Sequence, residues 1–204
     1  MAITCPVDLD TQQLRCEVSK MYTRVVAEPR GVFHFHRGPT YAVEFLGYDA
    51  RELATLPAET TGAFAGIGNP HRIGPISAGE TVMDIGCGAG MDLLLAARRV
   101  GRAGRAIGVD MTDAMVERAQ ASARAAGLAQ VEVRKGDATS LPVEGGSVDV
   151  VISNGVVNLV PEKARAFDEI VRVLKPGGRL QFADILLDEE LSEDARRNID
   201  LWTG

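Results

Sequence analysis

The sequence lacks the features that would place it in a membrane, outside the cell or on a nucleic acid. No apolar stretch approaches the roughly 20 residues of a membrane span, and no basic segment followed by an apolar one opens the chain. Its three cysteines form no C-x-x-C pair, which is typical of reduced thiols. The 28 acidic residues outnumber the 22 basic ones, and no basic stripe is present to attract a phosphate backbone. We therefore expect a cytoplasmic protein with no membrane and no nucleic acid among its partners.

Histidine is also scarce, with three residues in the chain. His34 and His36 form an H-x-H pair, which alternation would place on one face of an extended segment over residues 32–39. A metal site could use this pair with His71 as a third ligand. No carboxylate or cysteine completes a recognisable ligand set, so no metal is expected.

What the sequence does have is an apolar run that leads through an acid into three alternating glycines. Residues 81–85 read Thr-Val-Met-Asp-Ile, Gly86, Gly88 and Gly90 follow, and residues 91–97 are again mostly apolar. This order predicts a buried strand, a tight loop and a helix. The bare backbone N–H groups of such a loop and of a helix N-terminus attract anionic groups. We interpret the stretch as a cofactor-binding site.

Four more strands are predicted, over residues 105–110, 131–135, 148–153 and 179–185, and they alternate with helical patterns. Strands that alternate with helices specify a parallel sheet with right-handed crossovers. Ligands bind at the carboxyl ends of such strands. The second strand ends there in Asp110, which can accept hydrogen bonds from both hydroxyls of a ribose.

The first 75 residues are predicted to form an N-terminal helical cap segment, followed by the cofactor-binding domain over residues 76–204. A helix is predicted over residues 8–27, and two short helices over 40–46 and after the capping residue Asp49. The glycine-rich stretch 60–70 is expected to hold no regular structure. It is either a mobile cover over the site or a plain connecting loop, and the sequence leaves both open.

The spacing of the glycines decides which cofactor the loop favours. A dinucleotide fingerprint requires G-x-G-x-x-G, whereas Met91 stands at the place of its third glycine. D-x-G-x-G-x-G at residues 84–90 resembles motif I of the class I S-adenosylmethionine (SAM) methyltransferases. IGVD, GDA, SVDVVISN and LKPGG then follow in that family's order, and the resemblance covers residues 79–187. An NAD-dependent dehydrogenase is disfavoured.

The resemblance implies a Rossmann-like, doubly wound α/β fold with a mostly parallel sheet and with SAM as cofactor. The family's sheet usually ends in an antiparallel hairpin, which nothing after Gly204 supplies, so we expect a C-terminally incomplete domain with an exposed last strand. A homodimer through that edge would cover it. The cofactor-binding residues that the resemblance implies are Asp84, Gly86, Cys87, Gly88, Gly90, Asp110, Met111, Gly136, Asp137, Ala138 and Asn154.

The resemblance also implies a role for each part of this set. Asp84 and the glycines would line the methionine end of SAM, and Asp110 would hold the ribose. Met111 would pack on the adenine, and residues 136–138 would contact its edge, although an isolated Gly-Asp is more often a turn. Asn154 would lie beside the amino acid part or the reacting methyl group.

A narrower resemblance, to arsenite methyltransferases, rests on GIGNP at residues 66–70, GVDMT at 108–112 and SNGVVNLVPEK at 153–163. Those enzymes typically hold trivalent arsenic by cysteine thiolates, two of them at the positions of Ile67 and Gly155. Soft As(III) prefers soft sulfur, so this chain lacks two groups that would hold it. A further cysteine of that family lies beyond the part that this chain matches.

Three functions stay open. Methyl transfer from a sulfonium is an in-line displacement, so the protein chiefly aligns donor and acceptor and excludes water. The leading hypothesis is a SAM-dependent methyltransferase that acts on a small-molecule acceptor other than arsenite. A true arsenite methyltransferase would need external thiols, or Cys5 and Cys16, as arsenic ligands. A SAM-binding protein or fragment without turnover is the third hypothesis.

A hydroxyl or amine acceptor also needs a group that takes its proton. The sequence offers His34, His36, His71 and Asp184 and does not rank them. His71, which follows the GNP loop, and Asn154 are the candidate catalytic residues.

Overall fold

A parallel sheet forms the centre of the molecule. The computed structural model describes residues 10–28, 31–186, 188, 192 and 202. Within them five strands run in the order β3-β2-β1-β4-β5, and every neighbouring pair is parallel. The strands are β1 (Thr81–Ile85), β2 (Arg105–Asp110), β3 (Val131–Lys135), β4 (Val148–Asn154) and β5 (Leu174–Ala183). The predicted α/β fold with a doubly wound sheet is confirmed.

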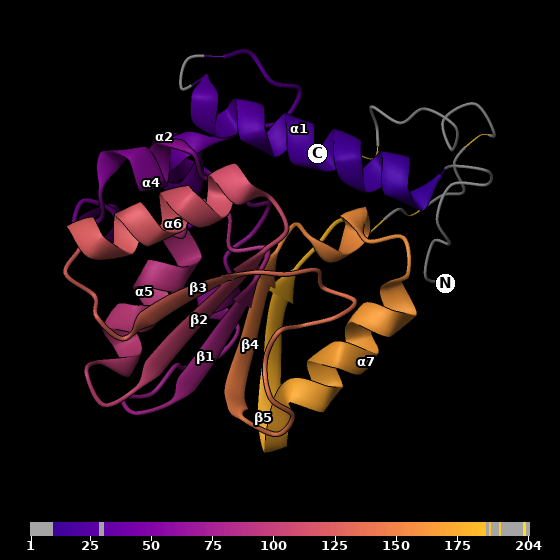
Figure 1. The fold of residues 1–204 in the computed structure, drawn as a ribbon. Helices are drawn as coiled ribbons and strands as arrows, with labels where there is room; N and C mark the ends of the chain where they lie inside the picture. The colour runs from indigo at the N-terminus through magenta and orange to yellow at the C-terminus, as the bar shows by residue number, and fades with distance from the viewer. Residues whose placement is uncertain (1–9, 29–30, 187, 189–191, 193–201, 203–204) are drawn as a thin grey trace.

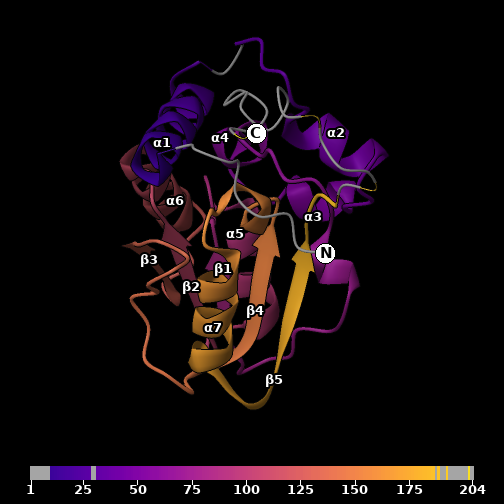
Figure 2. The same ribbon diagram turned by 90° about the vertical axis from the view of Figure 1, so that its right-hand side faces the viewer.

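Helices cover both faces of this sheet. In the described residues they are α1 (Thr11–Ala27), α2 (Gly38–Glu44), α3 (Ala50–Leu53), α4 (Ala58–Gly62), α5 (Met91–Val100), α6 (Asp113–Ala125) and α7 (Lys163–Val173), with 3-10 turns η1 (Pro70–Arg72) and η2 (Val157–Leu159). Helices α5 and α6 lie on one face and α7 on the other, while α1 crosses above the carboxyl ends of the strands (Figure 1, Figure 2). None of the helices within these ranges combines the length and the apolar character that crossing a membrane requires.

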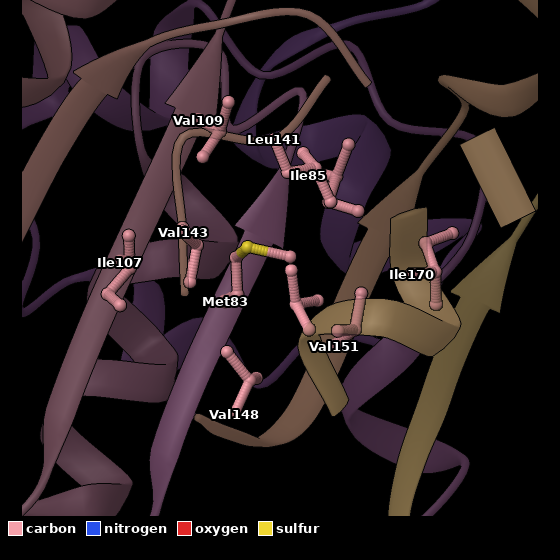
Figure 3. Close-up of a cluster of buried hydrophobic side chains, with 10 residues drawn as sticks. Met83, Ile85, Ile107, Val109, Leu141, Val143, Val148, Val151 and Ile170 are labelled. Atoms are coloured by element: carbon pink, nitrogen blue, oxygen red, sulfur yellow. The ribbon is translucent and has the colours of Figure 1, made fainter. Parts of the chain in front are cut away.

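The sequence of β1 shows why the sheet is buried on both sides. Met83 and Ile85 join a buried cluster with Ile170 of α7 (Figure 3). Val82, which alternation turns to the opposite face, packs with Ala96 of α5. An apolar run on both faces is typical of a parallel strand covered by helices. The sheet is therefore held by two apolar clusters, one under each layer of helices.

The strand order reverses between β1 and β4. Strands β2 and β3 follow outward from β1, and β5 follows outward from β4. At such a switch point the connections after the two central strands leave in opposite directions and open a crevice. The register pairs Ile85 with Ser153, so the glycine loop and Asn154 leave the sheet side by side.

The N-terminal helix is confirmed and lies against this crevice. Helix α1 begins after Asp10, whose side chain accepts a hydrogen bond from the backbone N–H of Gln12 at 2.8 Å. Val25 packs with Ala89 of the glycine loop and Met115 of α6. The helix is thus attached to the cofactor side of the sheet, and the division of the chain at residue 75 stays a prediction.

Residues 60–70 contain more regular structure than predicted. Helix α4 takes in Thr60 and Thr61, and η1 begins at Pro70. The buried hydroxyl of Thr60 donates to Ser122 Oγ at 2.6 Å. This tertiary contact outweighs the low helix propensity of the following glycine, so the expectation of an irregular stretch is wrong for its first residues.

The last predicted elements begin at other residues than expected. Helix α7 begins at Lys163, two residues after Pro161. Strand β5 begins at Leu174 and includes the Lys-Pro-Gly-Gly stretch 175–178, which precedes the strand predicted over residues 179–185. A register irregularity opposite these residues and a φ of 80° at Gly177 accommodate them in the strand.

Strands β3 and β5 form the two edges of the sheet within the described residues. A homodimer through β5 stays a prediction. The predicted last helix, over residues 192–202, lies outside the described residues except for its two end positions. Of these, Trp202 is buried against Leu14 and Val18 of α1.

Candidate functional site

A cavity of about 1090 Å³, including its open mouth, lies at the carboxyl ends of β1, β2 and β4. It collects residues that are far apart in the sequence: Asp84, Gly86, Cys87, Gly88, Asp110, Met111, Gly136, Asp137, Ala138 and Asn154. These are all the predicted cofactor-binding residues except Gly90. Neither Gly90 nor His71 lines the cavity.

The glycine loop brings bare backbone to the cavity. Gly86 and Gly88 have φ angles of 66° and 52°, which favour glycine. A Cβ at Gly86 would also lie 2.3 Å from Val156 Cγ2. Gly90, with φ 96°, precedes α5, and a Cβ there would lie 3.4 Å from Ala119 Cβ. Gly90 does not line the cavity, and its predicted part in cofactor binding stays a prediction.

Asp110 is fixed at the end of β2 by two backbone donors. Its Oδ2 accepts from Gly88 N and its Oδ1 from Thr112 N, both at 2.9 Å. Burial raises the pKa of Asp110 above its ordinary value, although these hydrogen bonds act in the opposite direction. Each oxygen keeps a second lone pair for a ligand, so the carboxyl group is already oriented to accept two hydroxyl donors.

Three carboxyl groups gather around this end of the cavity, from Asp84, Asp92 and Asp110. Asp84 is 3% and Asp92 6% exposed, and Asp84 Oδ2 has no hydrogen-bond partner among the described residues. Burial raises the pKa of Asp84 well above its usual range, and the charges of Asp92 and Asp110 raise it further. Among the described lining residues Arg15 is the one with a positive charge, and it is paired with Asp137 and Glu162. The cavity therefore favours a cationic ligand.

The Cys87 thiol lies between the same acids and is not an activated nucleophile. Burial raises its pKa well above the ordinary value, and the charges of Asp110 and Asp84 add to the effect. A Cβ at Gly108 would lie 2.8 Å from its sulfur, so the side chain fills the space beside β2. Cys87 packs the loop against the sheet as a neutral thiol.

Asn154 fixes the Gly66–Gly68 segment against the cavity wall. Its Oδ1 accepts from Ile67 N at 2.9 Å and from Gly68 N at 3.0 Å. Its Nδ2 donates to Gly68 O at 2.8 Å and to Asp92 Oδ2 at 3.0 Å. These contacts make the segment an ordered part of the cavity wall, which is neither the mobile cover nor the plain connecting loop that the sequence left open.

A buried network that sequence reasoning missed stands behind Asn154. Tyr48 Oη donates to Asp92 Oδ1 at 2.7 Å and accepts from Asn154 Nδ2 at 3.2 Å. His71 Nε2 lies 3.2 Å from Asp92 Oδ1, with its side chain 2% exposed. His71 therefore supports Asp92 from behind and does not reach the cavity. The one signal in the sequence was Asp92 itself, an acid in the first turn of an otherwise apolar helix.

We expect Tyr48→Phe to destabilise the protein by about 1–3 kcal/mol, because it leaves a buried carboxylate oxygen without its donor. Thermal unfolding measures the change. Tyr41→Phe is the matched control, since no hydrogen bond of the Tyr41 hydroxyl is present among the described residues. Equal melting temperatures for the two variants would show that the network does not stabilise the fold.

Arg15 of α1 closes one side of the mouth. Its Nε lies 2.9 Å from Asp137 Oδ2 and its Nη2 2.7 Å from Glu162 Oε2. Burial pushes the pKa of Asp137 up, but hydrogen bonds from Thr139 and the charge of Arg15 outweigh it and leave that pKa below its ordinary value. Both oxygens of Asp137 have partners in this arrangement, so its predicted contact with adenine stays a prediction.

A second cavity, of about 540 Å³ with its open mouth, adjoins the first across Tyr22, Ala65, Gly66 and Gly155. Ile67 and Gly155 lie together in its wall, and a Cβ at Gly155 would be 3.3 Å from Ile67 Cγ1. The two positions at which the narrower resemblance implies arsenic-binding cysteines are thus neighbours. In this chain they present carbon and hydrogen.

The histidines are separated in the structure. His36 lines the second cavity and stacks on Tyr41 with 5.1 Å between ring centroids. His34 lies edge-on to Phe35, and residues 32–37 form no strand, so the predicted extended face is wrong.

Within the described ranges no group of three histidine, cysteine or acidic side chains could hold a metal ion. Of the four proton acceptors that the sequence offered, His36 lines one of the two cavities, and His34, His71 and Asp184 line neither.

Three features together define one class of protein. They are a glycine loop at the switch point of a parallel sheet, an acid at the end of β2 and an acidic cavity between them. The chain belongs to the methyltransferase domain family, whose model matches residues 76–203, and with it to the class I SAM-dependent methyltransferases.

Within that class the chain is similar to arsenite methyltransferases. It is 45% identical to one from Halobacterium salinarum over 161 residues, which are 79% of this chain and 41% of the relative. It is 40% identical to one from Aquipseudomonas alcaligenes over 127 residues, 59% of this chain and 37% of the relative. An arsenic(III) SAM methyltransferase structure from Chlamydomonas reinhardtii superimposes with a TM-score of 0.67 at 39% identity, covering 72% of this chain and 52% of that one. The chain thus spans about half or less of the length of these proteins.

Proposed function

We propose that this chain binds SAM in the first cavity and transfers its methyl group to a small molecule bound in the second. The observation that carries the proposal is the group of Asp84, Asp92 and Asp110 around the glycine loop, with Asp84 Oδ2 buried and unpartnered. SAM is a nucleoside with two positive charges, an ammonium and a sulfonium. It also has a carboxylate, so its net charge is positive. Its ribose hydroxyls match Asp110, and its two positively charged groups match the acids, so the residues present fit this cofactor.

When bound, SAM supplies a methyl group on a positively charged sulfur. Asp84 and Asp92 bring negative charge to the methionine end, and Asp110 orients the ribose through its two oxygens. Asn154 holds residues 66–68 at the boundary of the two cavities. The positive charge disappears during transfer, so the chain needs to align donor and acceptor and to exclude water. Helix α1, attached by the ion pairs of Arg15 with Asp137 and Glu162 at one side of the mouth, limits the access of water.

Methylation of arsenite with external thiols is the second candidate, and the names of the relatives favour it. The absence of sulfur at positions 67 and 155 disfavours it, because the second cavity has only carbon atoms of Ile67 and Gly155 there. Assays with arsenite and glutathione distinguish the two. SAM binding without transfer to any acceptor would support the third, non-catalytic function.

The substitution Asp84→Asn tests the cofactor claim because it should change stability and binding in opposite directions. A raised pKa means that ionised Asp84 destabilises the free protein. Its favourable contribution is present below about pH 4 and is lost as the pH rises through the raised pKa. At neutral to alkaline pH we therefore expect the variant to melt about 2–4 °C higher without ligand. Calorimetry should show at least about tenfold weaker SAM binding, because a charge-assisted contact is lost.

The control is the same substitution at Asp149, near the start of β4 and beside the start of β1. Asp149 accepts from Thr81 N at 2.8 Å and pairs with Lys175, and its pKa is lowered although burial acts against the shift. Asp149→Asn should lower the melting temperature and leave SAM affinity unchanged. SAM binding that is equally strong in Asp84→Asn and in the wild type would contradict the proposed cofactor site.

A further inference from the structure

The second cavity has the walls of a site for a neutral ring compound. Its lining residues are Tyr22, Phe35, His36, Tyr41, Ala65, Gly66, Ile67, Gly155, Asn158 and Ile185. No acidic residue, lysine or arginine is among them, in contrast to the first cavity. With its open mouth the cavity measures about 540 Å³.

The aromatic rings are arranged in two stacked pairs. Tyr22 and Phe35 lie 6.1 Å apart between centroids at an interplanar angle of 21°. His36 and Tyr41 lie 5.1 Å apart at 27°. Rings held in this way offer flat, apolar faces to a planar ligand. Ile67 adds a branched apolar side chain at the place where a soft metalloid would need sulfur.

One buried polar atom in this lining has no hydrogen-bond partner among the described residues. Asn158 Oδ1 is buried and accepts no hydrogen bond from any described residue. The backbone around it is held on both sides, because Asn158 N donates to Asp184 Oδ2 at 3.0 Å and Lys163 Nζ donates to Asn158 O at 2.8 Å. An unsatisfied buried acceptor on a fixed backbone is unfavourable until a ligand supplies a donor.

We propose that the second cavity binds a neutral, planar aromatic hydroxyl compound, a phenol or its enol equivalent, whose hydroxyl donates to Asn158 Oδ1 and receives the methyl group. This inference rests on the proposed function, because the methyl donor occupies the first cavity. The shared wall of Tyr22, Ala65, Gly66 and Gly155 places the two compounds side by side.

The transfer step balances without a further reactant. A lone pair of the hydroxyl oxygen forms the new O–C bond to the methyl carbon, and the S–C bond breaks with its electron pair left on sulfur. The products are the methyl ether and neutral S-adenosylhomocysteine (SAH). As the O–C bond forms, the hydroxyl proton leaves its hydrogen bond to Asn158 Oδ1 and goes to the His36 imidazole and from there to solvent, since His36 both lines the cavity and is exposed.

The test uses 2-naphthol as the probe, with naphthalene as the same ring system without a donor. Binding of each is measured by fluorescence titration of the SAH-saturated protein. We expect 2-naphthol to bind roughly tenfold more tightly than naphthalene, which is the effect of one buried hydrogen bond. With labelled SAM the expected product is 2-methoxynaphthalene.

Three variants separate the parts of the site. Asn158→Leu should make the two probes bind within about twofold of each other, with SAH affinity unchanged because Asn158 does not line the first cavity. Tyr41→Leu should weaken both probes about fivefold by removing a stacking face. Its matched control is Phe45→Leu, a neighbouring exposed aromatic outside the cavity. His36→Phe keeps a ring, so binding should persist while the transfer rate falls at least tenfold.

The outcomes separate this inference from the function on which it rests. Failure of SAH and SAM to bind would contradict the proposed function and, with it, the proposed transfer step. If SAH binds but 2-naphthol binds no better than naphthalene, or Asn158→Leu leaves their difference intact, the proposed acceptor site is wrong. Methylation of arsenite in the presence of glutathione, with none of 2-naphthol, also overturns it.

Discussion

Replacing Asp110 by alanine is expected to weaken the binding of SAM and of SAH by at least about 100-fold. The carboxylate would accept two hydroxyl donors of the ribose, and hydrogen bonds to charged groups contribute about 1.5–3 kcal/mol each. The substitution also removes the acceptors of Gly88 N and Thr112 N, so the glycine loop loses the contact that orients it. Calorimetric titration with SAH, which does not turn over, measures the affinity directly.

The control for this prediction lies three residues further along the chain. Asp113 starts α6, its side chain is 72% exposed and it pairs with Lys135 at the surface. Asp113→Ala should leave SAH affinity within twofold of the wild type. Asp110→Asn, which keeps one oxygen, should lie between the alanine variant and the wild type. Unchanged SAH binding in Asp110→Ala, or tight binding of NAD by the wild type, would mean that the cavity holds a different cofactor in a different way.

The sequence predicted the parts of the site that depend on neighbours along the chain. The glycine loop follows β1 and precedes α5, and Asp110 ends β2, so their positions follow from the strand–loop–helix pattern and the parallel topology. Asp84 could be assigned to the site because it lies two residues before Gly86, as in the motif that the loop resembles. Its missing hydrogen-bond partner could not be predicted, because that depends on which donors other elements bring to the same place.

The parts that sequence reasoning missed all depend on contacts across the fold. Tyr48, far from the glycine loop in the chain, reaches Asp92 and Asn154, and no local pattern marks it. His71 follows a motif loop and was expected near the acceptor, yet its ring packs behind Asp92. Gly90 has the spacing of a binding glycine, and its φ of 96° favours glycine, but it does not line the cavity. Motif spacing gives a residue's place along the chain, whereas packing decides which way it faces.

Restoring sulfur at positions 67 and 155 is expected to raise As(III) affinity at least about 100-fold over the wild type, because two soft thiolates then replace an apolar contact. The effects of the two substitutions on stability should depend on each other. A Cβ at Gly155 lies 3.3 Å from Ile67 Cγ1, and Gly155 has a φ of 73°. Gly155→Cys alone therefore adds backbone strain of roughly 1–2 kcal/mol and crowds Ile67. Ile67→Cys removes the branched side chain and relieves the crowding, so the double variant should be more stable than the sum of the single effects predicts.

The matched control is the double serine variant, in which the same two positions carry oxygen of similar size and the same backbone strain. Only the cysteine pair should bind As(III), measured by equilibrium dialysis with a phosphine reductant, since a dithiol reductant would compete for the arsenic. Because Ile67 and Gly155 are neighbours in the second cavity, the pair should also weaken 2-naphthol binding when As(III) is present. Equal As(III) binding by the cysteine and serine pairs would show that these positions do not form an arsenic site in this chain. Tight As(III) binding by the wild type would mean that other groups hold it and would favour arsenite as the acceptor.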